Sequence, residues 1–381
     1  MTYDFDQEIE RRGTDSHKWR KYGDDVIPLW VADMDFVSAQ PIIEALHKRV
    51  AHGVFGYTQA PRELSLVIQE RLKRLYGWEV REEDIIFLPG VVSGLNLAFH
   101  VYAEPGDEVL VQPPVYSHFI RDPLLHGRAV IDQSLVEKGD TYEIDFDALD
   151  KPITDRTKLF ILCNPHNPVG RVFATKELER LAEICLRHNI IICSDEIHCD
   201  LIYPGYRHVP IATLGPEVEN QTVTLMAPSK TFNVPGLGCA FAIIKNETLR
   251  RMWISGSQGL IPHVNIMGLV AALAAYRDGQ EWLDQVLFYL KGNRDFLMQH
   301  VREKLPRLRM KKMEATYLAW LDCRNAGISG NPFEYFLREA RVALNDGADY
   351  GKGGAGFVRL NFACTRRRLT EALDHMAAAL K

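Results

Sequence analysis

Short apolar runs that alternate with helical patterns constrain the fold of this chain more than any other feature. The runs are KLFILC at 158–163, IIICS at 190–194, TVTLMA at 222–227 and GCAFAII at 238–244. Between the first two runs, a helical face begins near Thr175, ends near Asn189 and carries Leu178, Leu181, Ala182, Cys185 and Leu186. Strands that are apolar on both faces are typical of a parallel sheet covered by helices on both sides. The sequence therefore predicts an α/β fold, a three-layer sandwich around a mostly parallel sheet.

The pattern changes from about Trp282. A long helical pattern is followed by the run YLAWLDC, a helix around 333–341, the run GFVRLNFAC and a last helix. A chain of 381 residues also exceeds what one core usually carries. We therefore expect a large domain at 37–281 and a smaller α+β domain at 282–381, completed by an N-terminal arm at 1–36.

Composition and charge exclude several classes of function. The net charge is −5, so nucleic acid is an unlikely main partner, and the basic stretch RRGTDSHKWRKYG is short enough to be a solvated or subunit-contacting arm. No apolar stretch reaches the roughly 18 residues needed to cross a membrane, and the acidic start MTYDFDQEIE does not resemble a secretory leader. The 7 cysteines form no CxxC pair, which favours reduced thiols in a cytoplasmic protein and no metal site.

Polar side chains follow three of the apolar runs directly. Asn167 lies in NPHNPVG after the first run, Asp195 follows the second, and Lys230 follows the third. Lys230 has no other charged residue within ten positions on either side, which is unusual for a surface lysine. Ligands of open α/β sheets bind beyond the carboxyl ends of the strands, so we expect these three side chains to meet in one site.

The chemistry of this triad favours pyridoxal phosphate as cofactor. The chain has neither GxxxxGK[ST] nor a strand-linked GxGxxG, which argues against common nucleotide-binding sites. Pyridoxal phosphate needs a lysine for its Schiff base and an acidic partner for its ring nitrogen. A lysine that is partly desolvated near other cations has a lowered pKa and can act as nucleophile and base.

The motifs NPHNPVG, SDEIH and PSKTFNVPGLG resemble those of the fold-type I pyridoxal-phosphate enzymes, the aspartate aminotransferase superfamily, over essentially the whole chain. The resemblance implies a seven-stranded sheet in the large domain. It also implies that Lys230 binds the cofactor covalently, that Asp195 pairs with the ring nitrogen and that Asn167 contacts the phenolate oxygen.

The same resemblance assigns further residues. The amides of Val91 and Val92 would bind the phosphate at a helix N-terminus, and Tyr116 would stack on the ring. Tyr57 would reach the phosphate of a neighbouring subunit, which implies a homodimer with shared sites. Arg359 would bind the α-carboxylate of the amino acid substrate with both guanidinium nitrogens.

Two positions depart from the aminotransferase pattern. Gly238 stands where those enzymes usually have a phosphate-binding arginine, and His198 stands where they usually have a tyrosine. We therefore expect other phosphate donors, such as Ser229 and Thr231. We expect His198 to be a buried polar residue near the cofactor rather than a catalytic base.

The motif VADMDF at 31–36, the segment SKTFNVPGL and the missing arginine together resemble the cystathionine β-lyase, or cysteine C–S lyase, subgroup. The resemblance places the loop with Asp33 and Asp35 over the substrate, although both residues could simply shape that loop. It implies cleavage of L-cystathionine or related L-cysteine S-conjugates to a thiol, pyruvate and ammonia. The alternatives are an aminotransferase with the same cofactor and a non-enzymatic regulator, although a degenerate site, the sign of such a regulator, is not seen.

Overall fold

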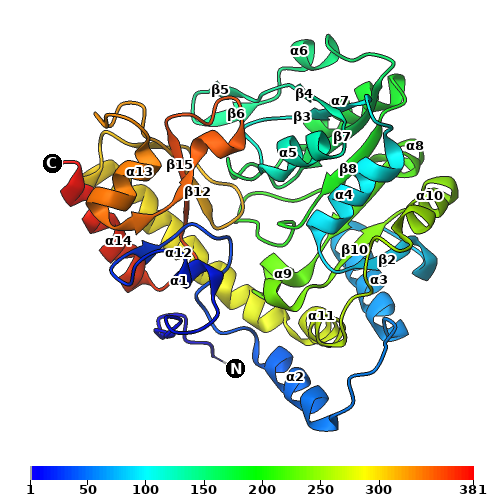
Figure 1. The fold of residues 1–381 in the computed structure, drawn as a ribbon, viewed down its shortest axis with the longest axis horizontal. Helices are drawn as coiled ribbons and strands as arrows, with labels where there is room; N and C mark the ends of the chain where they lie inside the picture. The colour runs from blue at the N-terminus through cyan, green and yellow to red at the C-terminus, as the bar shows by residue number, and fades with distance from the viewer. Residues whose placement is uncertain (1) are drawn as a thin grey trace.

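The computed structural model describes residues 2–381, and a seven-stranded sheet forms its centre (Figure 1). In spatial order the strands are β2 (Ile85–Leu88), β10 (Ala240–Ile243), β9 (Thr222–Met226), β8 (Ile191–Asp195), β7 (Thr157–Cys163), β3 (Glu108–Val111) and β4 (Ala129–Asp132). Strand β10 runs antiparallel to both of its neighbours, whereas β9, β8, β7, β3 and β4 pair in parallel.

Helices cover both faces of this sheet because successive strand residues point to opposite sides. In β7, Leu159 and Ile161 pack with α4 (Val91–Tyr102), α5 (His118–Leu125) and α10 (Glu247–Ser257). Phe160 and Leu162 pack on the other side, against α7 (Thr175–Arg187). The three-layer α/β fold predicted from the apolar strands is confirmed.

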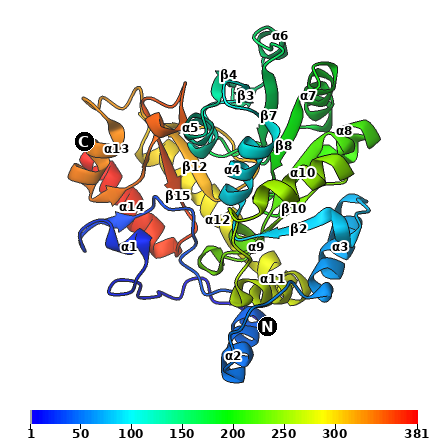
Figure 2. The ribbon, with the colours of Figure 1, turned by 45° about the vertical axis from the view of Figure 1, so that its right-hand side comes forward.

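A third group of helices lies beside the β10 end of the sheet. Helix α11 (Ile266–Asp278) packs against α2 (Gln40–His52) and α3 (Arg62–Tyr76). Figure 2 shows α2 projecting from this end of the molecule. Shorter elements lie elsewhere in residues 37–281: β5 (Val136–Lys138), β6 (Thr141–Glu143), α6 (Phe146–Asp150), α8 (Pro216–Asn220) and α9 (Pro228–Thr231).

The C-terminal third forms a second, smaller sheet. Its strand order is β11 (Arg309–Met310), β12 (Leu318–Asp322), β15 (Phe357–Asn361) and β14 (Asn345–Asp346), and all its pairs are antiparallel. The long helix α12 (Gln280–Lys304) and the last helix α14 (Arg366–Ala379) pack with it. The helix expected at 333–341 is instead α13 (Pro332–Tyr335) followed by a π-helical turn at Phe336–Ala340.

The N-terminal segment lies beside these C-terminal elements in both views (Figures 1 and 2). It carries the short helix α1 (His17–Arg20) and strand β1 (Ile27–Pro28), which pairs in parallel with β13 (Val342–Ala343). We propose, in line with this pairing, that 1–36 and 282–381 form one domain and 37–281 the other. No helix within residues 2–381 combines the length and the apolar character that a membrane span requires.

Candidate active site

A cavity of about 400 Å³ lies where several strands of the central sheet end. Cys163 closes β7, Asp195 closes β8, and Lys230 follows β9 in the short helix α9. The start of α4 and the strip Trp30–Ala32 of the N-terminal segment complete the wall. Nine residues predicted from the sequence line it together: Val91, Val92, Tyr116, Asn167, Asp195, His198, Ser229, Lys230 and Arg359.

Lys230 is the nucleophilic group of this cavity. Its Nζ donates a hydrogen bond to the backbone carbonyl of Ala32 at 2.7 Å. Burial, together with the charge of Arg359, lowers the pKa of Lys230 to about 8, although the charges of Asp33 and Asp195 act in the opposite direction. A substantial fraction of this amine is therefore neutral, and nucleophilic, slightly above neutral pH.

Asp195 supplies a carboxylate that lacks a cationic partner. Its Oδ1 accepts the backbone N–H of Ile197 at 3.1 Å, and within residues 2–381 it makes no ion pair. Burial, with a smaller contribution from the charge of Glu196, raises the pKa of Asp195 to about 7, although the Ile197 hydrogen bond and the charge of Lys230 act against it. A protonated ring nitrogen beside this carboxylate would remove the cost of burying an unpaired charge.

Arg359 is buried and is held by neutral acceptors alone. Its guanidinium donates to Oδ1 of Asn167 at 3.0 Å, to Oδ1 of Asn345 at 2.6 Å and to the carbonyl of Trp30 at 3.0 Å. Its Nε is buried without a hydrogen-bond partner, and within residues 2–381 no carboxylate pairs with it. A buried guanidinium without a counter-ion favours binding of an anionic ligand such as a carboxylate.

The amino end of α4 offers free backbone donors to the cavity. Val91, Val92 and Ser93 are the first three residues of this 12-residue helix, and such amides have no acceptor within the helix itself. Ser229 lines the same cavity, and the amide donors together with the helix dipole favour a phosphate group here.

Gly238 also lines this part of the cavity, and its backbone conformation explains why position 238 is not an arginine. Its φ is +59°, in the left-handed region that side chains rarely adopt, and an added Cβ would lie 3.1 Å from the carbonyl oxygen of Pro89. A side chain at this position would therefore strain the backbone next to the α4 N-terminus.

His198 and Tyr116 complete the polar lining. The Nδ1 of His198 is buried without a partner. Burial, together with the charges of Lys230 and Arg359, lowers the pKa of His198 to about 3, so this imidazole is neutral. Burial also raises the pKa of Tyr116, whose ring centroid lies 4.8 Å from that of His118.

Three predicted residues do not line the cavity. Thr231 is buried and donates to Asp200 at 3.0 Å, so the expectation that it binds phosphate is wrong. Asp33 lies just beyond the lining strip, where its carboxylate pairs with Arg11 at 2.8 Å. Tyr57 lies in the connection between α2 and α3 and is fully exposed.

The structure also adds lining residues that the sequence did not reveal. Asn345 carries no motif of its own and reaches the cavity because β14 pairs with β15, where it lies opposite Arg359. Trp30 directly precedes the VADMDF motif, and that adjacency was the one available signal for it.

The residues present fit pyridoxal phosphate as a bound group. They offer a nucleophilic lysine, an unpaired carboxylate, a helix N-terminus for phosphate and a buried guanidinium for a carboxylate, all around one cavity. Each feature is chemically complementary to one group of the cofactor or of an amino acid substrate.

Comparisons with known proteins agree with this geometry. Residues 24–376 match the family model for class I and II aminotransferases. The chain is 41% identical to the cystathionine β-lyase PatB of Bacillus subtilis, over 99% of this chain and 99% of PatB. It is 36% identical to a cystathionine β-lyase of Corynebacterium glutamicum, over 98% of this chain and 98% of that protein.

A solved structure of cystalysin from Treponema denticola, which contains a pyridoxal 5′-phosphate cofactor, superposes with a TM-score of 0.96 at 32% identity, covering 100% of this chain and 99% of that one. The resemblance inferred from the sequence motifs is therefore confirmed. The chain belongs to the class I and II aminotransferase family, in the subgroup whose named members are cystathionine β-lyases.

Proposed function

We propose that this protein is a pyridoxal-phosphate-dependent carbon–sulfur β-lyase. Its substrate would be L-cystathionine or a related L-cysteine S-conjugate, which reacts with one water to give a thiol, pyruvate and ammonia. The observation that carries the proposal is one cavity that combines a low-pKa lysine, an unpaired carboxylate and a buried guanidinium, in a chain whose relatives are named cystathionine β-lyases.

Each side chain has a task in this proposal. Lys230 would hold the cofactor covalently and Asp195 would keep the proton on its ring nitrogen. Asn167 would contact the phenolate oxygen, and Tyr116 and His198 would contact the ring. The amides of Val91 and Val92 and the hydroxyl of Ser229 would bind the phosphate. When bound, the cofactor withdraws electrons from the substrate Cα and so makes its proton acidic.

Lys230 would accept the proton from the substrate Cα. Arg359 binds the substrate carboxylate, and Asn167 and Asn345 hold the guanidinium that does so. The substrate's own amino group would replace Lys230 on the cofactor and so free the lysine amine. This anchoring would then present the Cα proton to that amine, which with a pKa of about 8 is a competent base around neutral pH. The electron pair left at Cα expels the thiolate from Cβ, because sulfur is a good leaving group there.

An aminotransferase is the alternative, since both reactions begin with the same proton transfer. An aminotransferase must also accept a keto acid as amino acceptor. Among the residues of 2–381 that line the cavity, Arg359 and Lys230 are the cations, so this lining offers no second arginine for a dicarboxylic acceptor. The lining therefore favours elimination over transfer to a dicarboxylic keto acid.

The exposed connection between α2 and α3 supports a homodimer as part of the proposal. Val54, Phe55 and Tyr57 are all exposed, an arrangement that leaves apolar surface in water unless another surface covers it. In a two-fold dimer, Tyr57 would reach the cofactor phosphate in the partner's cavity.

The 7 free cysteines are compatible with the reducing cytoplasm, where we place the protein.

The test is release of pyruvate from L-cystathionine by the purified protein loaded with pyridoxal phosphate, with no keto acid added. Continued pyruvate release with an unchanged absorption spectrum of the cofactor supports the lyase. A single stoichiometric spectral change, with turnover only after a keto acid is added, would instead identify an aminotransferase.

A further inference from the structure

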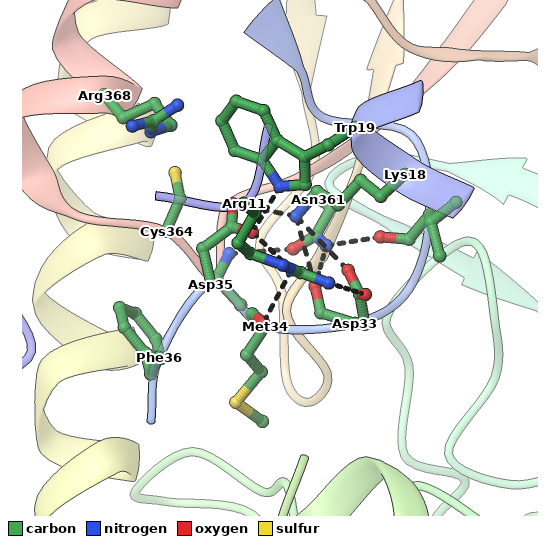
Figure 3. Close-up of polar contacts among 12 residues, drawn as sticks. Arg11, Lys18, Trp19, Asp33, Met34, Asp35, Phe36, Asn361, Cys364 and Arg368 are labelled. Carbon is green, nitrogen blue, oxygen red and sulfur yellow. Dashed lines mark hydrogen bonds and ion pairs between the residues drawn. The ribbon is translucent and has the colours of Figure 1, made fainter. Parts of the chain in front are cut away.

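A cluster of buried charges lies just outside the cavity, within the N-terminal arm, where residues 11–19 contact the VADMDF motif. The carboxylate of Asp35 accepts hydrogen bonds from Arg11 at 2.6 Å and from Lys18 at 2.9 Å. It also accepts one from the indole N–H of Trp19 at 3.1 Å. Figure 3 shows Arg11 reaching both Asp35 and Asp33, so that one arginine links the two acids of the motif.

Burying these charges costs desolvation free energy. The Lys18 side chain has 0% exposure and that of Asp35 has 5%. Burial tends to raise the pKa of Asp35, but the charges of Lys18 and Arg11 outweigh it and hold that pKa below its ordinary value. Removing each ion from water costs several kcal/mol, so buried ion pairs add little net stability. The cluster is therefore better explained by how it positions the neighbouring backbone than by a contribution to stability.

The backbone in question is the strip Trp30–Asp33, which contains no helix or strand. Two of its carbonyl groups accept hydrogen bonds from the reactive side chains. Trp30 accepts from Arg359 at 3.0 Å, and Ala32 accepts from Lys230 at 2.7 Å. One short strip thus contacts both the amine and the guanidinium of the proposed mechanism.

Side chains from elsewhere hold this strip at its edges. The amide of Asn361 donates to the carbonyls of Val31 and Asp33, both at 2.6 Å. The backbone N–H of Asp35 donates to the carbonyl of Ala363 at 2.9 Å. The strip also contacts residues 11–19 directly, because the indole N–H of Trp30 donates to the carbonyl of Lys18 at 3.1 Å and Nζ of Lys18 donates to the carbonyl of Asp33 at 3.3 Å. The Asp35 carboxylate adds a side-chain anchor just beyond the strip, because it accepts from Arg11, Lys18 and Trp19 at once.

We propose that Asp35, held by Arg11, Lys18 and Trp19, is a positioning residue that sets where the carbonyls of Trp30 and Ala32 meet Arg359 and Lys230. The N-terminal arm is thereby part of the catalytic apparatus, although Asp35 itself does not line the cavity. The inference rests on the proposed roles of Lys230 and Arg359.

The test compares Asp35→Asn with a matched control, Asp84→Asn. Asp84 is also fully buried and also binds arginines, Arg250 at 3.1 Å and Arg81 at 2.9 Å, but it ends the 3-10 turn Glu82–Asp84 just before β2 and does not line the cavity. Both substitutions remove a buried carboxylate that pairs with two cationic side chains, and both should lower Tm. A difference between the two variants therefore reports positioning rather than lost stability.

The first readout needs no cofactor. Labelling of Lys230 by trinitrobenzenesulfonate in the cofactor-free full chain is followed against pH by peptide mass spectrometry. Asp35→Asn should lower the labelling midpoint, because a displaced Ala32 carbonyl no longer stabilises the ammonium. At a pH below the midpoint, Lys230 should then react about 3- to 10-fold faster, which corresponds to about half to one pKa unit. Asp84→Asn should leave the midpoint unchanged.

The second readout is the KM of the loaded enzyme for L-cystathionine. Asp35→Asn should raise KM about 10-fold because Arg359 loses a fixed acceptor, while Asp84→Asn should not. A lowered Tm in Asp35→Asn with the wild-type labelling midpoint and the wild-type KM would overturn the inference, since Asp35 would then be structural only.

Arg11 offers a milder substitution if Asp35→Asn fails to fold, because its side chain is 22% exposed. Arg11→Gln should shift the midpoint in the same direction and Arg11→Lys should restore it; wild-type values in both would overturn the inference. If the wild-type protein releases no pyruvate, the proposed function fails, while the labelling experiment still tests Asp35, because the contact between Lys230 and Ala32 lies within the chain.

Discussion

Asn345 and Arg359 lie opposite each other on the paired strands β14 and β15, and the amide oxygen of Asn345 accepts a hydrogen bond from the guanidinium at 2.6 Å. The partner is an amide and not a carboxylate, so the arginine is oriented without being neutralised. Its positive charge remains available to a ligand, which is what binding of a substrate carboxylate requires.

Asn345→Asp tests this relationship. The new carboxylate would pair with Arg359 and compete with the substrate, so KM for L-cystathionine should rise by about 10-fold or more with a smaller change in kcat. Steady-state kinetics check the prediction, with Asn345→Ala as control. A KM below that of Asn345→Ala would contradict it.

Arg359→Ala should reduce kcat/KM more severely. Loss of a charged bidentate contact corresponds to about 3 kcal/mol, or on the order of 10²-fold, expressed mainly in KM. Arg359→Lys keeps the charge but loses the planar fork, so it should recover only part of the loss. An unchanged KM in both variants would exclude the proposed role of Arg359.

Lys230→Ala should prevent covalent attachment of the cofactor. Wild-type protein treated with pyridoxal phosphate and then borohydride should carry the cofactor on the peptide that contains Lys230, as seen by mass spectrometry. The variant should carry none there, and Lys245→Ala is a control because Lys245 contacts the backbone of Glu79 outside the cavity. Attachment to another lysine in the wild-type protein would refute the assignment.

Asp195 should make the stability of the cofactor-free protein depend on pH. Burial raises the folded-state pKa of Asp195 to about 7, whereas an unfolded aspartate titrates near 3.9. Between these values the folded state binds more protons than the unfolded state, so stability should fall as pH rises from about 4 to about 7, by roughly 4 kcal/mol at most.

The measurement for Asp195 is thermal unfolding of the cofactor-free protein across this pH range, compared with Asp195→Asn. The difference between the two curves should shrink in the presence of pyridoxal phosphate, whose protonated ring nitrogen stabilises the carboxylate. Parallel curves without cofactor would show that the carboxyl group is not desolvated.

Gly238→Ala should destabilise the protein. The left-handed φ and the close Pro89 carbonyl together cost about 1–2 kcal/mol, measured as a lower urea midpoint. Gly236→Ala, two residues earlier, is the matched control, because its φ is not left-handed and an added Cβ meets nothing within 4 Å. Equal effects of the two substitutions would contradict this account of the missing arginine.

Tyr57 can be tested by mixing two impaired variants. If Tyr57 completes the partner's site, Tyr57→Ala and Lys230→Ala chains should form mixed dimers with one intact site each. Random pairing then restores about a quarter of the wild-type sites. Activity should appear on mixing under conditions that exchange subunits; a mixture no more active than its components would place Tyr57 outside the shared site.

The sequence by itself determined the fold class and the centre of the site. Strands buried on both faces must be apolar throughout, so the alternation of such runs with helical patterns already predicted the three-layer sheet. Asn167, Asp195 and Lys230 follow strands that end at one edge of that sheet, so their meeting followed from topology.

Only the tertiary structure decided which other groups surround Lys230. Thr231 turns away to Asp200, Asn345 reaches Arg359 through strand pairing, and the carbonyl of Ala32 accepts from Lys230. None of these contacts leaves a periodic or local signal. They depend on backbone atoms and on segments far apart in the chain, whose relative positions are set by packing of the whole core.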